Sequence, residues 1–151
     1  MPGNYERKNE YKAFYVVFQS SSNNRFWAGF TAPGFQHVWL FWGKDVGKPG
    51  LLTPQWTLKY EPLANHFDID LWYQDPMTTA ETYLADSLVT DILKINIRII
   101  SNAEFAPRGI ITCISSAKYA MGIKAWWVMT PKQLYFYLLR KGAKSLKGDL
   151  K

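Results

Sequence analysis

The only cysteine of the chain, Cys113, stands where a helix is expected to begin. Thr112 before it is a residue type that caps helices, and Gly122 is a typical stop after the following turns. Unpaired N–H groups and the helix dipole at a first turn stabilise a thiolate, which is the nucleophilic form of cysteine. A lone cysteine is more often a small buried apolar residue, so position alone leaves a structural role open.

A catalytic cysteine needs a base within hydrogen-bond reach, and the chain has two histidines. His37 lies in the apolar run of residues 36–40, where an ionisable group is costly unless it is partnered or placed at a cleft. Such a histidine is also commonly a hydrogen-bonded core residue. His66 follows Asn65 at the entrance of a later strand and is interpreted as a surface residue. His37 is therefore the candidate base.

A third polar group normally fixes the tautomer and orientation of a catalytic imidazole. Glu61 is the first choice, because it closes the strand that follows the histidine strand and precedes Pro62. The alternatives left open are Gln55 and Thr57 on the same strand face, His66 and Asp68.

The elements that must position these side chains follow from hydrophobic periodicity. Strands are predicted over residues 11–19, 35–42, 55–60, 67–73 and 93–100, with residues 25–30 as a hairpin partner of the first. Helices are predicted over residues 79–86, 113–121 and 131–141, the last between Thr130-Pro131 and Gly142. The fold class is α+β: a single domain with a mainly antiparallel sheet of about five to six strands followed by C-terminal helices. Residues 1–10 are assigned to a polar arm, 11–142 to the domain and 143–151 to a basic tail.

Composition agrees with one compact unit. The chain has 151 residues, a length typical of one domain and cramped for two. Because 48% of these residues are apolar, they can form one sizeable core. Seven tryptophans are present, and most of them, Trp126 and Trp127 included, lie in or beside predicted elements, so core packing is their expected role. One cysteine excludes an internal disulfide and a multi-cysteine zinc site.

The formal net charge of +6 favours contact with nucleic acid, anionic lipid or an acidic partner. Much of the excess lies near the C-terminus, which is expected to be a solvated end. The N-terminal residues lack the apolar centre of a signal peptide, and no apolar run has membrane-spanning length. These features predict a cytoplasmic or virion-associated protein without integral membrane association.

Together, these motifs resemble those of a known family. A histidine in a strand, a second strand ending in the acid-proline pair Glu61-Pro62, and then a cysteine at a helix start are similar to the circularly permuted papain-like hydrolases related to NlpC peptidases and lecithin:retinol acyltransferase. Residues 112–123, followed by Thr130-Pro131 and the rest of that helix, resemble the cysteine helix and TP-x-x-L-Y helix of bacterial and phage members.

The resemblance implies a permuted papain-like fold with Cys113 as nucleophile and His37 as base. It implies a thiol-dependent hydrolase, peptidase-like or amidase-like, or an acyltransferase, acting on an amide or ester. Peptidoglycan stem peptides are one candidate substrate. It does not identify the orienting residue or a side-chain oxyanion donor. No cofactor is expected.

Two other functions are compatible with the sequence. Basic residues with many aromatics could bind a nucleic-acid strand, and a phage virion or assembly component could retain the fold with little or no activity. Alternate aspartates, Asp68, Asp70 and Asp75, suggest a metal site only weakly, since no His or Cys ligands cluster with them. Residues 43–50 lack the spacing of a phosphate-binding loop. Neither a metal nor a phosphate site is expected.

Overall fold

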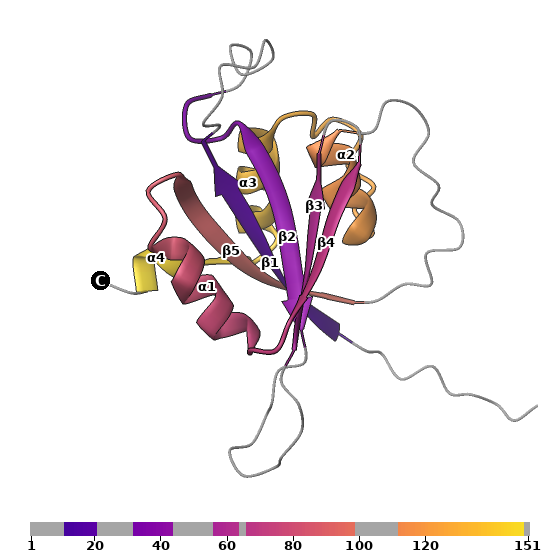
Figure 1. Cartoon of the computed structure of the whole chain (residues 1–151). Helices are drawn as coiled ribbons and strands as arrows, with labels where there is room; N and C mark the ends of the chain where they lie inside the picture. Colours follow the sequence, from indigo (N-terminus) through magenta and orange to yellow (C-terminus); the bar gives the residue numbers. More distant parts are fainter. Residues whose placement is uncertain (1–10, 21–31, 44–55, 64–65, 99–111, 150–151) are drawn as a thin grey trace, which may run out of the picture.

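The computed structural model describes residues 11–20, 32–43, 56–63, 66–98 and 112–149. These residues form one antiparallel sheet of six strands in the order β4-β3-β2-β1-β5-β6, with helices on both faces (Figure 1). The elements are β1 (Tyr11–Gln19), β2 (His37–Gly43), β3 (Thr57–Pro62), β4 (Phe67–Trp72), α1 (Pro76–Leu84), β5 (Val89–Arg98), α2 (Cys113–Ala120), α3 (Pro131–Arg140), β6 (Lys144–Ser145) and α4 (Leu146–Asp149). The predicted α+β class with a mainly antiparallel sheet is confirmed.

The two central strands, β1 and β2, are apolar on both faces because both faces are covered. In β1, Phe14, Val16 and Phe18 contribute to one buried cluster, whereas Tyr15 and Val17 contribute to a second. This alternation follows from the two-residue period of a strand. It explains why β1 reads as a continuous apolar run in the sequence.

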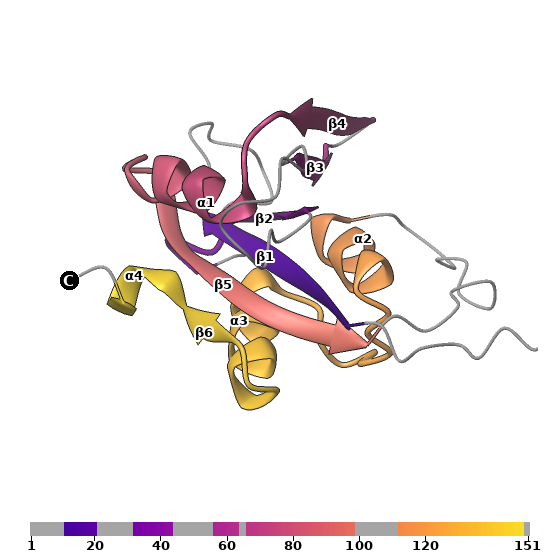
Figure 2. The ribbon, with the colours of Figure 1, turned by 90° about the horizontal axis from the view of Figure 1, so that it is seen from below.

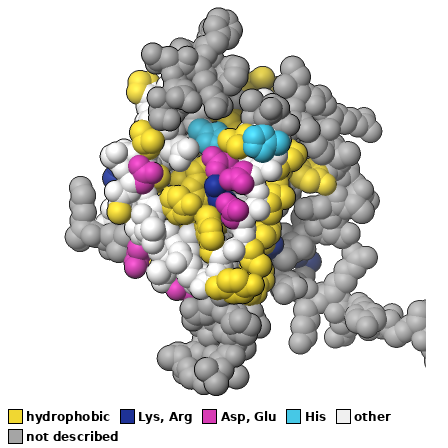
Figure 3. Space-filling model, in the orientation of Figure 1, with side chains coloured by type: hydrophobic (Ala, Val, Ile, Leu, Met, Phe, Trp, Pro, Cys, Tyr) yellow, Lys and Arg dark blue, Asp and Glu magenta, His cyan; other side chains and the backbone are white. Residues whose placement is uncertain are grey.

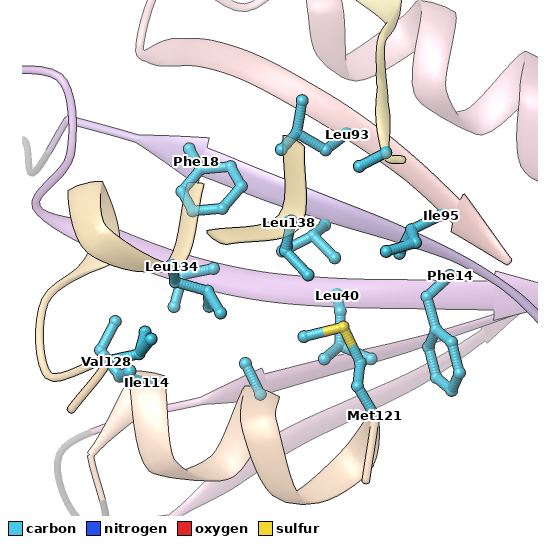
Figure 4. Packing of buried hydrophobic residues seen from close by; sticks show 14 of the residues in the cluster. Phe14, Phe18, Leu40, Leu93, Ile95, Ile114, Met121, Val128, Leu134 and Leu138 are labelled. Atoms are coloured by element: carbon cyan, nitrogen blue, oxygen red, sulfur yellow. The ribbon is translucent and has the colours of Figure 1, made fainter. Parts of the chain in front are cut away.

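Helices α2 and α3 pack on one face of the sheet and α1 on the other (Figure 2). Ile114 and Met121 of the α2 region and Leu134 and Leu138 of α3 fill the first cluster (Figure 4). The second cluster contains Ala80 of α1. Across the described ranges, no helix is both long and apolar enough to cross a membrane.

The ends of α2 and α3 agree with the capping residues expected from the sequence. Thr112 accepts a hydrogen bond from the backbone N–H of Ser115, and Thr130 accepts one from the backbone N–H of Gln133; both are capping boxes. Gly122 has a φ of 67°, a left-handed conformation that glycine adopts without strain after a helix end. Cys113 is therefore fixed at the first turn of α2.

The structure differs from the sequence prediction at several boundaries. Helix α1 begins at Pro76, earlier than predicted, because Asp75 caps it by accepting hydrogen bonds from the N–H groups of Met77 and Thr78. Residues 144–149, assigned to a basic tail, form β6 and α4 instead, and Leu146 is buried in the second cluster. The predicted strand over residues 25–30 lies outside the described residues.

The prediction of core packing was wrong for two tryptophans. Trp126 and Trp127 lie between α2 and α3 and are 80% and 57% exposed. Their neighbours Ala125 and Val128 take the buried positions of this connection instead. Trp39, by contrast, is buried as expected.

Candidate active site

The first residue of α2 and the first residue of β2 meet at one end of the sheet. Helix α2 packs against β2 and β3, so the half-buried Cys113 is brought to His37. The thiol of Cys113 lies close enough to the imidazole to be among the groups that raise the pKa of His37. The structure thus brings together the two residues that the sequence proposed as nucleophile and base, although 76 positions separate them in the chain.

Glu61 contacts the other side of the imidazole. Its Oε1 atom lies 3.0 Å from Nε2 of His37, and the two side chains are only 15% and 19% exposed. With Nε2 held by the carboxylate, Nδ1 is the ring nitrogen that remains for the thiol of Cys113. Such a contact fixes both the tautomer and the orientation of the ring.

The surroundings of His37 favour its protonated form. Burial opposes the positive charge, but the hydrogen bonds to Cys113 and Glu61, and the charges of these groups, outweigh it and raise the pKa of His37 to about 9. Near neutral pH the ring is therefore an imidazolium beside a cysteine. That is the arrangement in which a thiolate is stabilised and a proton is ready for a leaving group.

Lys59 holds the second oxygen of Glu61. Its Nζ lies 2.7 Å from Oε2 of Glu61, 2.9 Å from Oδ2 of Asp68 and 3.9 Å from Oδ2 of Asp70. Burial opposes ionisation of Glu61, but His37 and Lys59 outweigh it and lower the pKa of this carboxyl to about 2.

Burial likewise opposes the charge of Lys59, yet Glu61 and Asp68 raise its pKa. On this face, acidic side chains gather around a basic one, next to the two histidines (Figure 3). Glu61 is thus held as a carboxylate whose two oxygens have different partners. One of these oxygens faces His37, and the other faces Lys59.

The start of α2 offers a hydrogen-bond donor that can stabilise a negative charge. The first N–H groups of a helix have no partner within it, and the backbone N–H of Cys113 is one of them. An oxyanion formed by attack of the Cys113 sulfur on a carbonyl would develop beside this N–H and the positive end of the helix dipole. The geometry suits acyl transfer through a thioester.

Of the described candidates for the orienting role, Glu61 has its carboxylate within hydrogen-bond distance of His37. Glu61 contacts His37, whereas the hydroxyl of Thr57 donates to the backbone carbonyl of Gln74, and Asp68 contacts Lys59. His66 is exposed, and Gln55 lies outside the described residues. Among the aspartates weighed as metal ligands, Asp68 and Asp70 face Lys59 and Asp75 caps α1.

Sequence reasoning missed Lys59. A usable signal was present, because Lys59 and Glu61 are two residues apart on β3 and therefore share a face. The register places Asp70 opposite Lys59 and Asp68 opposite Glu61 on β4. A basic residue among three acidic positions on neighbouring strands predicts an ion-pair group.

Replacing Lys59 with methionine is expected to destabilise the protein in a pH-dependent way. The lowered pKa of Glu61 contributes stability that is present above its ordinary value of 4.5 and is lost as the pH falls through about 2. Lys59→Met removes part of this contribution and leaves three acidic side chains close together. The deficit in free energy of unfolding should be largest near pH 7 and shrink towards pH 2, as measured by urea denaturation.

Lys59→Arg is the matched control, since it keeps the charge and should retain most of the stability. A deficit in Lys59→Met of equal size at pH 3 and pH 7 would show that Lys59 acts through packing, for example over the ring of Trp39, rather than through the carboxylates.

No protein-family model, curated protein or solved structure matches this chain. The interpretation of the site therefore depends on its own geometry.

Proposed function

We propose that the protein is a thiol-dependent acyl hydrolase or acyltransferase of the circularly permuted papain-like type, acting on an amide or ester carbonyl. The single observation that carries the proposal is the grouping of three residues. Cys113 opens a helix and influences the pKa of His37, and Nε2 of His37 lies 3.0 Å from Oε1 of Glu61. A nucleophile, a base and an orienting carboxylate in sequence are the parts that this chemistry requires.

The arrangement of elements supports the finer assignment of the fold. The histidine strand β2 and the acidic strand β3 precede the cysteine helix α2 in the chain, the order of the permuted branch. Helix α2 packs against both strands. The resemblance noted in the sequence and the contact geometry thus agree on the same residues.

The reaction would proceed in two stages. The Cys113 thiolate attacks the carbonyl carbon, and the backbone N–H of Cys113 donates to the oxyanion. As the tetrahedral intermediate collapses, the carbon–leaving-group bond breaks and His37 transfers its proton to the departing amine or alcohol.

In the second stage, His37, now neutral, accepts a proton from water or from another acceptor as that molecule attacks the thioester. The sulfur leaves as thiolate, and the imidazolium is restored. Throughout, Glu61 remains a carboxylate and stabilises the imidazolium, since its lowered pKa keeps it ionised. Water gives hydrolysis, and an alcohol or amine acceptor gives transfer.

An activated ester tests the first stage without knowledge of the natural substrate. Incubation with p-nitrophenyl acetate should release p-nitrophenolate in a burst and leave one acetyl group on the protein. Peptide mapping by mass spectrometry is expected to place this group on Cys113. Acetylation confined to lysines, with Cys113 unmodified, would contradict the proposal. Peptidoglycan stem peptides are the first natural amides to test afterwards.

A further inference from the structure

The connection between α2 and α3 presents three large apolar side chains to solvent. Trp126 is 80% exposed, Trp127 57% and Met129 75%. The two indole rings contact each other edge to face, with centroids 6.0 Å apart. Exposed apolar side chains grouped in this way mark a candidate interaction site.

Hydrogen bonds from a side chain of α2 hold the backbone of this connection. Nζ of Lys118 donates to the backbone carbonyl oxygens of Ala125, at 3.0 Å, and Val128, at 2.7 Å. Both of these residues are buried, and Val128 belongs to the same buried cluster as Ile114 of α2 (Figure 4). Trp126 and Trp127 lie between the buried residues Ala125 and Val128, so the fold itself keeps them exposed.

The C-terminal side of the connection is held as well. Oε1 of Gln133 accepts hydrogen bonds from the backbone N–H groups of Met129, at 2.8 Å, and Thr130, at 3.1 Å. Met129 therefore projects from an ordered backbone directly before α3. Because the backbone is already held, binding would need to order only the side chains.

The sequence on both sides of this connection is basic. Lys124 precedes the tryptophans, and Lys132 follows Met129 in the first turn of α3; both are exposed. Over residues 112–149 the sequence has one acidic residue, Asp149, and these basic ones: Lys118, Lys124, Lys132, Arg140, Lys141, Lys144 and Lys147. Apolar side chains with a cationic rim complement a surface that is apolar inside and anionic outside.

The size of the patch favours a bilayer over a protein partner or a second copy. A fully covered aromatic side chain buries roughly 150–250 Å². Two tryptophans and one methionine therefore fall short of the roughly 800 Å² per partner of a stable protein interface. Tryptophan, in contrast, is favoured at the boundary between lipid headgroups and acyl chains, where basic residues add attraction to anionic lipid.

We propose that Trp126, Trp127 and Met129, with Lys124 and Lys132 at their rim, dock the protein on the surface of an anionic lipid bilayer. The apolar side chains enter the headgroup region and the lysines contact lipid phosphates. This interaction is peripheral and does not depend on the acyl transfer proposed above.

Vesicle co-sedimentation tests the proposal with the full chain. Vesicles of phosphatidylcholine with phosphatidylglycerol should bind the protein, and vesicles of phosphatidylcholine alone should bind it at least about tenfold more weakly. The double variant Trp126→Ser/Trp127→Ser should lose about tenfold or more of the affinity for the anionic vesicles. Lys132→Glu should weaken binding too, and added salt should weaken binding of the wild type.

Tyr73→Ser is the matched control, because Tyr73 is 85% exposed and directly follows β4, so it is not part of this connection. It should bind like the wild type, as should Cys113→Ala, which separates docking from catalysis. All variants should retain the wild-type circular dichroism spectrum.

Three results would overturn the proposal. The first is the absence of binding to anionic vesicles, and the second is equal binding by the double tryptophan variant and the wild type. The third is a concentration-dependent dimer in light scattering that the double variant abolishes, since a second copy would then be the occupant.

Discussion

Replacing Cys113 with alanine is expected to abolish acyl transfer. The variant lacks the atom that forms the thioester, so the burst with p-nitrophenyl acetate and the acetylated peptide should both disappear. Steady-state ester hydrolysis should fall by at least about a thousandfold, as expected when a covalent step is removed. Stopped-flow absorbance and mass spectrometry measure the two effects.

Stability separates a catalytic role of Cys113 from a structural one. The side chain is half-buried and packs against the first cluster, so alanine should cost only a modest free energy of unfolding. Cys113→Ser keeps the size and the cap geometry and serves as the conservative control. Persistent turnover in a folded Cys113→Ala variant would show that the activity belongs to another group.

Replacing His37 with alanine is expected to lower the rate of acylation by about 10²–10⁴-fold. The substitution removes the imidazolium that stabilises the thiolate and the proton that the leaving group needs. The loss should be larger for an amide than for an activated ester, since p-nitrophenolate departs without protonation. The single-turnover rate constant, measured with both kinds of substrate, reports the two losses.

His66→Ala is the matched control for this experiment. His66 is exposed and is the second of the chain's two histidines, so its removal should leave the rate unchanged. Glu61→Gln should reduce the rate less than His37→Ala, because the amide can still accept a hydrogen bond but no longer stabilises the imidazolium. Equal rates in His37→Ala and His66→Ala would refute the role assigned to His37.

Local sequence patterns predict most of the helices and strands and the position of Cys113. Capping residues and glycine stops predicted where α2 and α3 begin and end, because these ends are determined by contacts within a few residues. The same local reasoning placed Cys113 at a helix start. Glu61 was the first choice among several polar residues, and only the three-dimensional arrangement singles it out as the partner of His37.

The features that sequence reasoning missed depend on contacts between distant segments. Strand β6 pairs with β5 and is too short to show a period of its own. Leu146 is buried only because the chain returns to the sheet, whereas the basic sequence around it is typical of a solvated end. The exposure of Trp126 and Trp127 likewise depends on Lys118 holding the backbone of their connection.

The rate of Cys113 alkylation at neutral pH tests the central claim most directly. In the wild type, Cys113 should react with iodoacetamide faster than a free thiol does, because a neighbouring imidazolium and a helix start activate a cysteine. His37→Ala should slow this reaction, and His66→Ala should not. A wild-type rate no faster than that of a free thiol, or a Cys113 that does not react in the folded protein, would contradict the proposed catalytic site.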